Sequence, residues 1–200
     1  MTSHPTSIKA IELTTERFVL RPIEPVAFAR RTLHWTTDRQ AFVDLAWKTD
    51  GWTMWRWWRH VRKLARKDRM GHGIWPKGAT EAIGLHMVTY QPATGNITFG
   101  VLIADHGWRG KGAVVEVREA VLGDCFERLG VHRATGWVNA RNFASLYNYQ
   151  RLGFRREAAL RESFVQLDGS LVDQLGFGLL RSEWFDRLGK QKSHQREDRT

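Results

Sequence analysis

The stretch RGKGAV, residues 109–114, stands between an apolar run and a run with helical spacing. Glycines let the backbone approach a ligand and turn its N–H groups outward, and a helix N-terminus adds partial positive charge. This combination predicts a turn that binds a pyrophosphate. A tight strand-to-helix turn also requires glycine, so a purely structural interpretation stays open. The stretch matches neither G-x-x-x-x-G-K-[ST] nor the third glycine of G-x-G-x-x-G.

The residues on either side of this turn predict one sheet with helices. The run from Val114 to Leu129 has apolar residues at helical spacing and stops at Gly130, as a helix with a glycine cap does. Strands are predicted at 17–23, 81–90, 96–104, 132–140 and on both sides of a turn at 168–170. Further helices are predicted from Pro25, within 51–69 and at 142–152. Loops are predicted at 36–53 and 68–80. This order is typical of an α+β (mixed α/β) fold.

Length and composition limit the domain organisation. The 200 residues, 42% of them hydrophobic, can bury one core and are too few for two ordinary domains. We expect one domain over residues 1–186 and a disordered polar tail at 187–200. The chain shows no membrane span and no signal-peptide pattern, so we expect a cytoplasmic protein without a membrane partner. The single cysteine, Cys125, and the histidines show no metal-ligand spacing, so we expect no metal.

The stretch GWTMWRWWRHVRKLARKDR, residues 51–69, concentrates the charge of the chain. Seven Lys and Arg against one Asp at 56–69 supply six of the ten net positive charges. Such a segment could contact nucleic acid, an acidic protein or an anionic cofactor, or it could be a solvated helix face. On a helix, Trp52 and Trp55 fall outside the apolar arc that includes Trp57. We expect these two rings either to line a substrate cleft or to cover neighbouring helices.

The turn at 109–114 resembles the acetyl-CoA loop of a known family. The GCN5-related N-acetyltransferases (GNAT) carry the pattern Q/R-x-x-G-x-G/A, which Arg109, Gly112 and the position of Val114 match. Val114 departs from the Gly or Ala of the last position. The resemblance implies that the backbone of this turn holds the pyrophosphate of acetyl-CoA.

A longer stretch is similar to one branch of that family. VNARNFASLYNYQRLGFRREAALRESFVQLDGSLVDQLGFGLLRSEW, residues 138–184, resembles the RimJ/RimL-type acetyltransferases, and so does TERFVLRP at 15–22. The resemblance covers roughly residues 12–185. It implies a GNAT fold, in which a single mixed and mostly antiparallel central sheet carries helices on both faces.

The resemblance also implies acetyl-CoA as donor and an amine as acceptor. It assigns to the cofactor the strand before the loop, the loop itself and the start of a later helix: Leu102, Ile103, Arg109, Gly110, Lys111, Gly112, Ala113, Val114 and Asn142. The contribution of Leu102 and Ile103 would come from their main chain. Asn142 would equally serve as a plain helix N-cap.

The catalytic groups are less sharply indicated. Tyr149, four residues before Gly153, matches the Y-x-x-x-G-F of relatives in which this tyrosine protonates the leaving thiolate. The resemblance therefore implies Tyr149 as general acid and leaves Ser145 as the alternative donor, although a packed tyrosine would also explain the residue. Candidates for a general base are Glu116 and His86, each with a structural explanation of its own. An amine that arrives neutral would need no base.

Three functions remain open from the residues. The first is an N-acetyltransferase that acts on a peptide or protein N-terminal α-amine, with the segment 56–69 aiding approach to an acidic protein or the ribosome. The second acts on a small amine such as an amino acid, polyamine or antibiotic, and the basic segment disfavours polycations. The third is a basic RNA-binding module. A binding module has no use for the loop followed by Asn142 and Tyr149, so an enzyme is favoured, as a monomer or homodimer.

Overall fold

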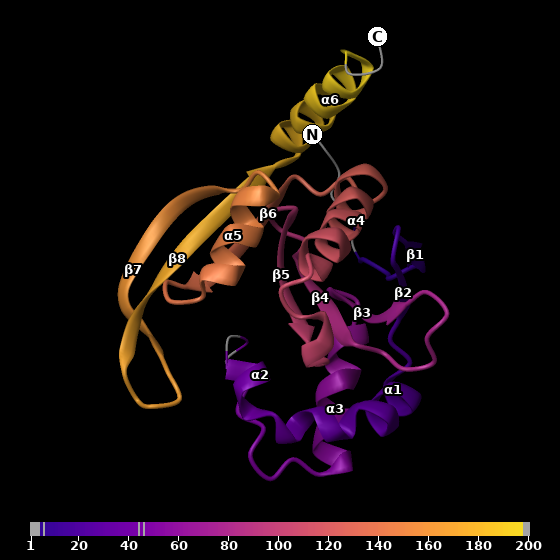
Figure 1. Cartoon of the computed structure of the whole chain (residues 1–200), viewed down its shortest axis with the longest axis vertical. Helices are drawn as coiled ribbons and strands as arrows, with labels where there is room; N and C mark the ends of the chain where they lie inside the picture. The colour runs from indigo at the N-terminus through magenta and orange to yellow at the C-terminus, as the bar shows by residue number, and fades with distance from the viewer. Residues whose placement is uncertain (1–4, 6, 44, 46, 198–200) are drawn as a thin grey trace.

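One mixed sheet runs through the molecule (Figure 1). The computed structural model describes residues 5, 7–43, 45 and 47–197. The eight strands of this described part are β1 (Leu13–Thr14), β2 (Phe18–Pro22), β3 (Arg69–Pro76), β4 (Gly84–Gln91), β5 (Asn96–Ile103), β6 (Arg133–Asn139), β7 (Arg155–Val165) and β8 (Leu171–Leu180), in the order β1-β2-β3-β4-β5-β6-β8-β7. Neighbours pair antiparallel except β5 and β6, which are parallel. The predicted α+β class is confirmed.

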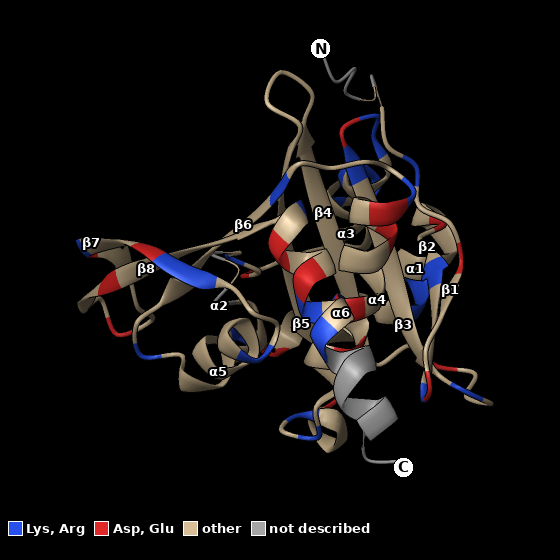
Figure 2. Cartoon of the chain, turned by 90° about the horizontal axis from the view of Figure 1, so that it is seen from above, with Lys and Arg blue, Asp and Glu red and all other residues tan. Residues whose placement is uncertain are grey.

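Helices cover both faces of the sheet. They are α1 (Pro25–Thr32), α2 (Arg39–Val43), α3 (Met54–Arg62), α4 (Ala113–Glu127), α5 (Phe143–Arg151) and α6 (Arg181–Glu197), with 3-10 turns η1 (Leu33–Thr37), η2 (Lys63–Ala65) and η3 (His106–Trp108). One buried cluster joins the sheet to α4, α5 and α6, and a second joins the other face to α1 and α3. Seen from above, the β7–β8 hairpin extends from one side, and β1 and β2 lie at the other (Figure 2).

Strand β3 lies where the sequence indicated a loop. It pairs with β2 and β4 along Arg69–Pro76, although its glycines disfavour a strand. Close packing explains them. A Cβ at Gly71 would lie 2.9 Å from Cβ of Leu64, and one at Gly73 would lie 2.7 Å from Cε2 of Phe28. The glycines therefore let η2 and α1 approach the sheet.

The C-terminal segment also differs from the expectation. We expected residues 187–200 to be disordered, whereas α6 continues to Glu197, and 198–200 lie outside the described residues. Trp184 is 2% exposed and packs against Phe126 with ring centroids 5.8 Å apart, which fixes the first turn of α6. Many of the residues that follow are Lys, Gln, Arg and Glu, good helix formers, so a polar segment can extend a helix that starts on the core.

The parallel pair β5–β6 is short, and this sets the position of a cleft. Its register runs only from Asn96 opposite Arg133 to Thr98 opposite Thr135. Strand β5 stays paired with β4 up to Ile103, and β6 stays paired with β8. The two strands therefore separate after Thr98 and Thr135.

Candidate functional site

A cleft of about 1320 Å³ lies where β5 and β6 separate. Side chains from both faces of the sheet line it. Ala41, Leu45 and Met87 belong to the cluster around α1–α3, whereas Phe99 and Tyr149 belong to the cluster around α4–α6. Residues from both faces of the sheet therefore line the cleft.

The end of β5 can offer main-chain groups to a ligand. Leu102 and Ile103 both line the cleft, and their side chains pack into the two opposite clusters. Within the described residues, β5 has no pairing with β6 beyond Thr98. Its free edge can pair with an extended ligand, as a strand would.

The turn RGKGAV has the conformation that an anion-binding turn needs. Gly110 and Gly112 both have φ of 74°, where other residues lose about 1–2 kcal/mol. A Cβ at Gly110 would meet no atom within 4 Å, so the requirement there is conformational. Gly112 caps α4, and the first N–H groups of a helix lack acceptors within it. The turn, which lines the cleft, thus supplies N–H donors and the positive end of a helix.

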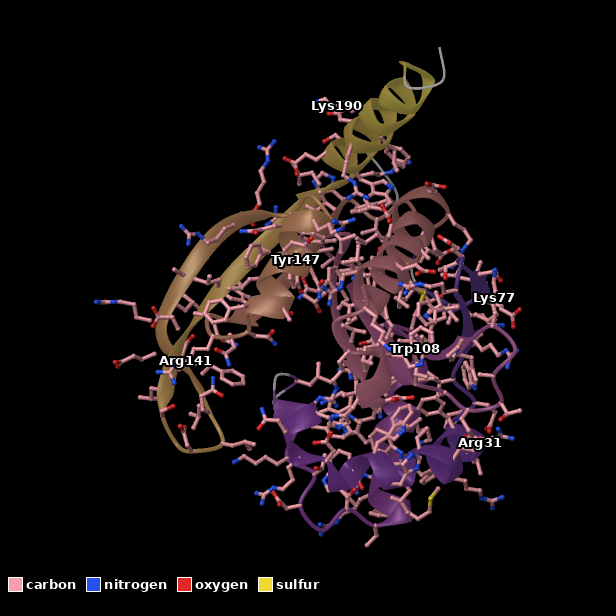
Figure 3. All side chains as sticks on the ribbon, viewed as in Figure 1. Arg31, Lys77, Trp108, Arg141, Tyr147 and Lys190 are labelled. Atoms are coloured by element: carbon pink, nitrogen blue, oxygen red, sulfur yellow. The ribbon has the colours of Figure 1, made fainter. Side chains whose placement is uncertain are left out.

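Arg109 holds this turn in place. Its Nε donates to the Ile103 carbonyl at 3.0 Å, and its Nη2 donates to Oδ2 of Asp38 at 3.1 Å. Asp38 also accepts from His106 at 2.9 Å. Trp108, just before Arg109, lies near the N-terminal end of α4 (Figure 3). The predicted cofactor residue Arg109 therefore anchors the turn to β5 and to the start of α2.

Tyr149 lies where β5 and β6 separate. Its side chain is 2% exposed, and the rings of Phe99 and Phe177 stack on it at centroid distances of 5.8 and 5.0 Å. Its hydroxyl touches the backbone of Gly136 on β6, since a Cβ at Gly136 would overlap it. Burial raises the pKa of this phenol, and the positive charge of Arg118 offsets part of the rise. The phenol therefore keeps its proton at neutral pH.

The start of α5 contributes two further candidates to the cleft wall. Asn142 is the N-cap, and its Oδ1 accepts from the Ser145 amide at 2.9 Å. Both residues line the cleft. Tyr147 lies on the same helix (Figure 3). It is 57% exposed and accepts a hydrogen bond from Arg151. The two tyrosines of α5 thus differ in burial, as their spacing predicts.

Glu116 is held by hydrogen bonds and an ion pair. Its Oε1 accepts from the Thr15 hydroxyl at 2.6 Å and from the Arg17 amide at 2.8 Å, and its Oε2 accepts from Arg17 Nε at 2.6 Å. Burial alone would raise the pKa of this carboxyl, but these bonds and the charge of Arg17 lower it overall. Arg17 Nη1 also donates to the Lys111 carbonyl. The geometry does not support Glu116 as general base, because Thr15 and Arg17, which lie between β1 and β2, occupy both of its oxygens.

We expect Glu116→Gln to destabilise the protein by about 1–3 kcal/mol at neutral pH, since it weakens charge-assisted hydrogen bonds. The pKa of Glu116 is lower in the folded state, so its contribution is complete above the ordinary value of 4.5 and is lost as the pH falls through the folded-state value. Urea unfolding between neutral and acidic pH measures the difference. Glu127→Gln, at an exposed position, is the control. A difference in unfolding free energy between wild type and Glu116→Gln that persists in acid would contradict the structural role of the Glu116 carboxylate.

His86 cannot serve as a base for a substrate in the cleft. Its side chain is fully buried on β4, it does not line the cleft, and neither ring nitrogen has a partner among the described residues. Burial and the charge of Arg118 lower its pKa well below the ordinary value. The ring stacks on Phe99 with centroids 6.1 Å apart. His86 is therefore a neutral core histidine.

The two tryptophans proposed as a substrate wall lie elsewhere. Neither Trp52 nor Trp55 is among the described residues that line the cleft. Trp52 packs against Trp57 and His60, with centroids 5.6 and 5.0 Å away. Trp55 is 59% exposed, and the Arg59 guanidinium lies 5.1 Å above its ring. Trp52 thus covers the core of α3, and Trp55 belongs to the outer basic surface.

Arg118 is one of the cleft residues that sequence reasoning missed. It lies on α4, is 2% exposed and lines the cleft. The signal was present, because position 118 is four residues before Leu122 and seven before Cys125, on the apolar stripe of the predicted helix. An arginine on a buried stripe indicates a function or a buried partner.

The cleft as a whole is positively charged. Among the described residues that line it, Glu116 is the only carboxylate, and the cations are Arg17, Arg109, Lys111, Arg118 and Arg151. This excess suits a ligand with several phosphates. The described residues contain no group of three or more His, Cys, Asp and Glu placed to hold a metal ion. Their helices include none with the length and apolarity to cross a membrane.

Comparison with known proteins identifies relatives of the same architecture. A family model described as "Acetyltransferase (GNAT) domain" matches residues 17–155. No curated protein sequence matches. Among solved structures, a GCN5-related N-acetyltransferase from Brucella melitensis is 21% identical, with a TM-score of 0.76 over 92% of this chain and 84% of that chain.

Two further structures resemble this chain at lower identity. An acetyltransferase (GNAT family) from Bacillus anthracis is 16% identical, with a TM-score of 0.73 over 86% of this chain and 99% of that chain. RimL, named as a ribosomal L7/L12 alpha-N-protein acetyltransferase in complex with coenzyme A, is 16% identical, with a TM-score of 0.75 over 85% of this chain and 98% of that chain. These likenesses show a shared fold.

Proposed function

The chain belongs to the GNAT family of acetyltransferases, and from this premise we propose that it acetylates the N-terminal α-amine of a protein or peptide with acetyl-CoA, as a RimJ/RimL-type enzyme. The observation that carries the proposal is the cleft between β5 and β6, with a glycine turn at one part of its wall and a buried phenol where the strands separate. The name of the structural relative RimL supports the acceptor class.

The residues of the cleft fit acetyl-CoA. The backbone of Gly110, Lys111 and Gly112 and the first amides of α4 would hold the pyrophosphate, with the Lys111 side chain adding charge. The free edge of β5 would pair with the amides of the pantetheine arm. Asn142 would reach the arm from the start of α5. The cofactor supplies the acetyl thioester.

The residues around Tyr149 would then assist the transfer. The attacking amine forms a bond to the acetyl carbon, the carbon–sulfur bond breaks, and the sulfur takes the electron pair. Tyr149, protonated at neutral pH, would hold a proton for that sulfur. Ser145, which also lines the cleft, is the alternative donor. The N–H of Leu102 or Ile103 would stabilise the developing charge on the thioester oxygen.

The other side of the cleft suits an extended acceptor. Gln40 and Ala41 of α2 line it, and so do Ser163, Phe164 and Gln174 of the β7–β8 hairpin. The volume of about 1320 Å³ exceeds the ~300–1,000 Å³ typical of a single small-ligand site. The cleft therefore has room for a peptide N-terminus beside the cofactor.

The basic surface of α3 would act while the enzyme approaches its acceptor, before the acetyl transfer. Arg56, Arg59, Arg62, Lys63 and Arg66 are exposed, and none lines the cleft. We propose that this surface steers the enzyme to an acidic protein or to the ribosome, which raises the association rate at low salt.

Two measurements test the function. Acetyl-CoA should raise the melting temperature by linkage, and no shift at millimolar ligand would remove the cofactor assignment.

Release of free CoA should then be followed with peptides that begin with Ser, Ala, Met or Asp, against amino acids and polyamines. If only the amino acids or polyamines are acetylated, the acceptor is a small amine and not a peptide. Salt-dependent RNA binding without any acetyl-CoA binding would favour the RNA-binding module.

A further inference from the structure

Arg118 is a buried cation that has no counter-ion among the described residues. Its Nε and Nη1 are buried and have no hydrogen-bond partner among the described residues. Its guanidinium carbon lies 4.7 Å from the ring centroids of both Phe99 and Tyr149. Aromatic faces attract a cation, but they do not replace the hydrogen bonds that a guanidinium loses with water. Burying such a group costs free energy unless a ligand compensates it.

The position of Arg118 coincides with the point of transfer. Phe99 follows the last residue of β5 that pairs with β6, and Tyr149 touches Gly136, which follows the last pairing residue of β6. Arg118 covers both rings and lines the cleft. The guanidinium, whose Nε and Nη1 lack partners among the described residues, therefore lies beside the phenol proposed as general acid.

The groups that face Arg118 leave its charge unneutralised. On α5 the neighbouring titratable group is Tyr149, protonated at neutral pH, and on β4 it is His86, kept neutral by burial. His72 on β3 pairs across from His86 and is also buried with a lowered pKa. The carboxylate of the cleft wall, Glu116, is satisfied by Thr15 and Arg17. Nothing in the described surroundings of Arg118 carries a compensating negative charge.

We propose that Arg118 is a fixed positive charge that drives the transfer, by keeping the acceptor amine deprotonated and by stabilising the sulfur anion as it leaves. The proposal rests on the acetyltransferase function above and adds an electrostatic role at that site. It also accounts for the missing general base, because Glu116 and His86 are both unavailable to a substrate.

Both effects follow from the sign of the charge. An ammonium that enters the cleft meets a like charge, so its pKa falls and its proton passes to water before attack. The neutral amine then attacks, the carbon–sulfur bond breaks with its electron pair going to sulfur, and the nearby cation favours that anion until Tyr149 protonates it. The proton that the new amide sheds returns to Tyr149 through solvent, which closes the balance.

Proton release on CoA binding tests the effect on sulfur without any acceptor. Calorimetric titrations in buffers of different ionisation enthalpy give the number of protons that the complex releases when CoA binds and when desulfo-CoA binds. Because desulfo-CoA lacks the thiol, the difference between the two numbers measures the ionisation of the thiol. A one-unit fall from a thiol pKa near 8.5 would release about 0.4 proton per CoA at pH 7.5. Arg118→Lys should retain this release, and Arg118→Met should abolish it. Equal release by wild type and Arg118→Met would overturn the proposal.

The pH–rate profile tests the effect on the amine, with a peptide that begins with Ser as acceptor. Arg118→Met should lower kcat about tenfold at neutral pH and move the acidic limb of the kcat profile, which reports the bound amine, upward by about one unit, so that the part of the loss due to the amine recovers in alkali. Arg118→Lys should keep the wild-type limb. A loss of equal size at every pH would indicate a structural role.

Stability separates the two roles independently. Arg118→Met replaces a buried unpaired charge with an apolar chain, so it should raise the melting temperature while it lowers turnover. A lower melting temperature with parallel profiles would assign Arg118 to packing. A wild type that binds acetyl-CoA but acetylates no peptide or small amine would count against the proposed function, whereas the calorimetric difference would still report on Arg118.

Discussion

Replacing Tyr149 with phenylalanine is expected to lower kcat by about 100-fold or more, because the departing sulfur would lose its positioned proton donor. The variant removes one oxygen, while the stacking on Phe99 and Phe177 that fixes the ring remains. Acetyl-CoA affinity should therefore change by less than about twofold. Steady-state kinetics and calorimetric titration with acetyl-CoA measure the two quantities.

Tyr90→Phe is the matched control for this experiment. Tyr90 is 2% exposed, its hydroxyl is buried without a partner among the described residues, and it does not line the cleft. Removing that hydroxyl should leave kcat unchanged. Unchanged turnover in Tyr149→Phe would reassign the proton to Ser145, and Ser145→Ala would then carry the loss.

The double variant Gly110→Ala/Gly112→Ala is expected to weaken acetyl-CoA binding by about 100-fold. Both residues have φ of 74°, and each alanine loses about 1–2 kcal/mol in that conformation, so the turn would relax and redirect its amides. The loss should appear in the acetyl-CoA dissociation constant. The pH dependence of the remaining turnover should stay the same, since Tyr149 and Arg118 are untouched.

Gly78→Ala/Gly130→Ala is the control for the backbone penalty. Gly78 and Gly130 have φ of 80° and 63°, no atom lies within 4 Å of an added Cβ at either, and neither lines the cleft. The control should lose similar stability and keep wild-type affinity. Equal affinity loss in both double variants would show that the glycines of the turn act through stability alone.

The sequence predicted the parts of this site that are encoded locally. The glycine turn, the helix after it and the hairpin around Asp168–Ser170 follow from residue types within a few positions of each other, and the structure contains all three. β3 was missed because its glycines are required by packing and not by local conformation. Gly71 packs against Leu64 of η2, and Gly73 packs against Phe28 of α1. Local propensity cannot report such a contact.

The catalytic groups depended on contacts that no local pattern encodes. From the sequence, Glu116 was a candidate general base. In the structure its oxygens accept hydrogen bonds from Thr15 and Arg17, which are about a hundred residues away in the chain. His86 stands in a strand whose register buries it completely. Arg118 broke the apolar stripe of its helix, and that conflict between local pattern and burial was the one readable sign of it.

The separation of β5 and β6 has a kinetic consequence. The residues that line the cleft between these strands come from both sides of the sheet. Under the proposed function, donor and acceptor would approach each other from opposite sides of the sheet and be bound together, so the acetyl group would pass directly from sulfur to the amine. Steady-state velocities would then follow a ternary-complex rate law.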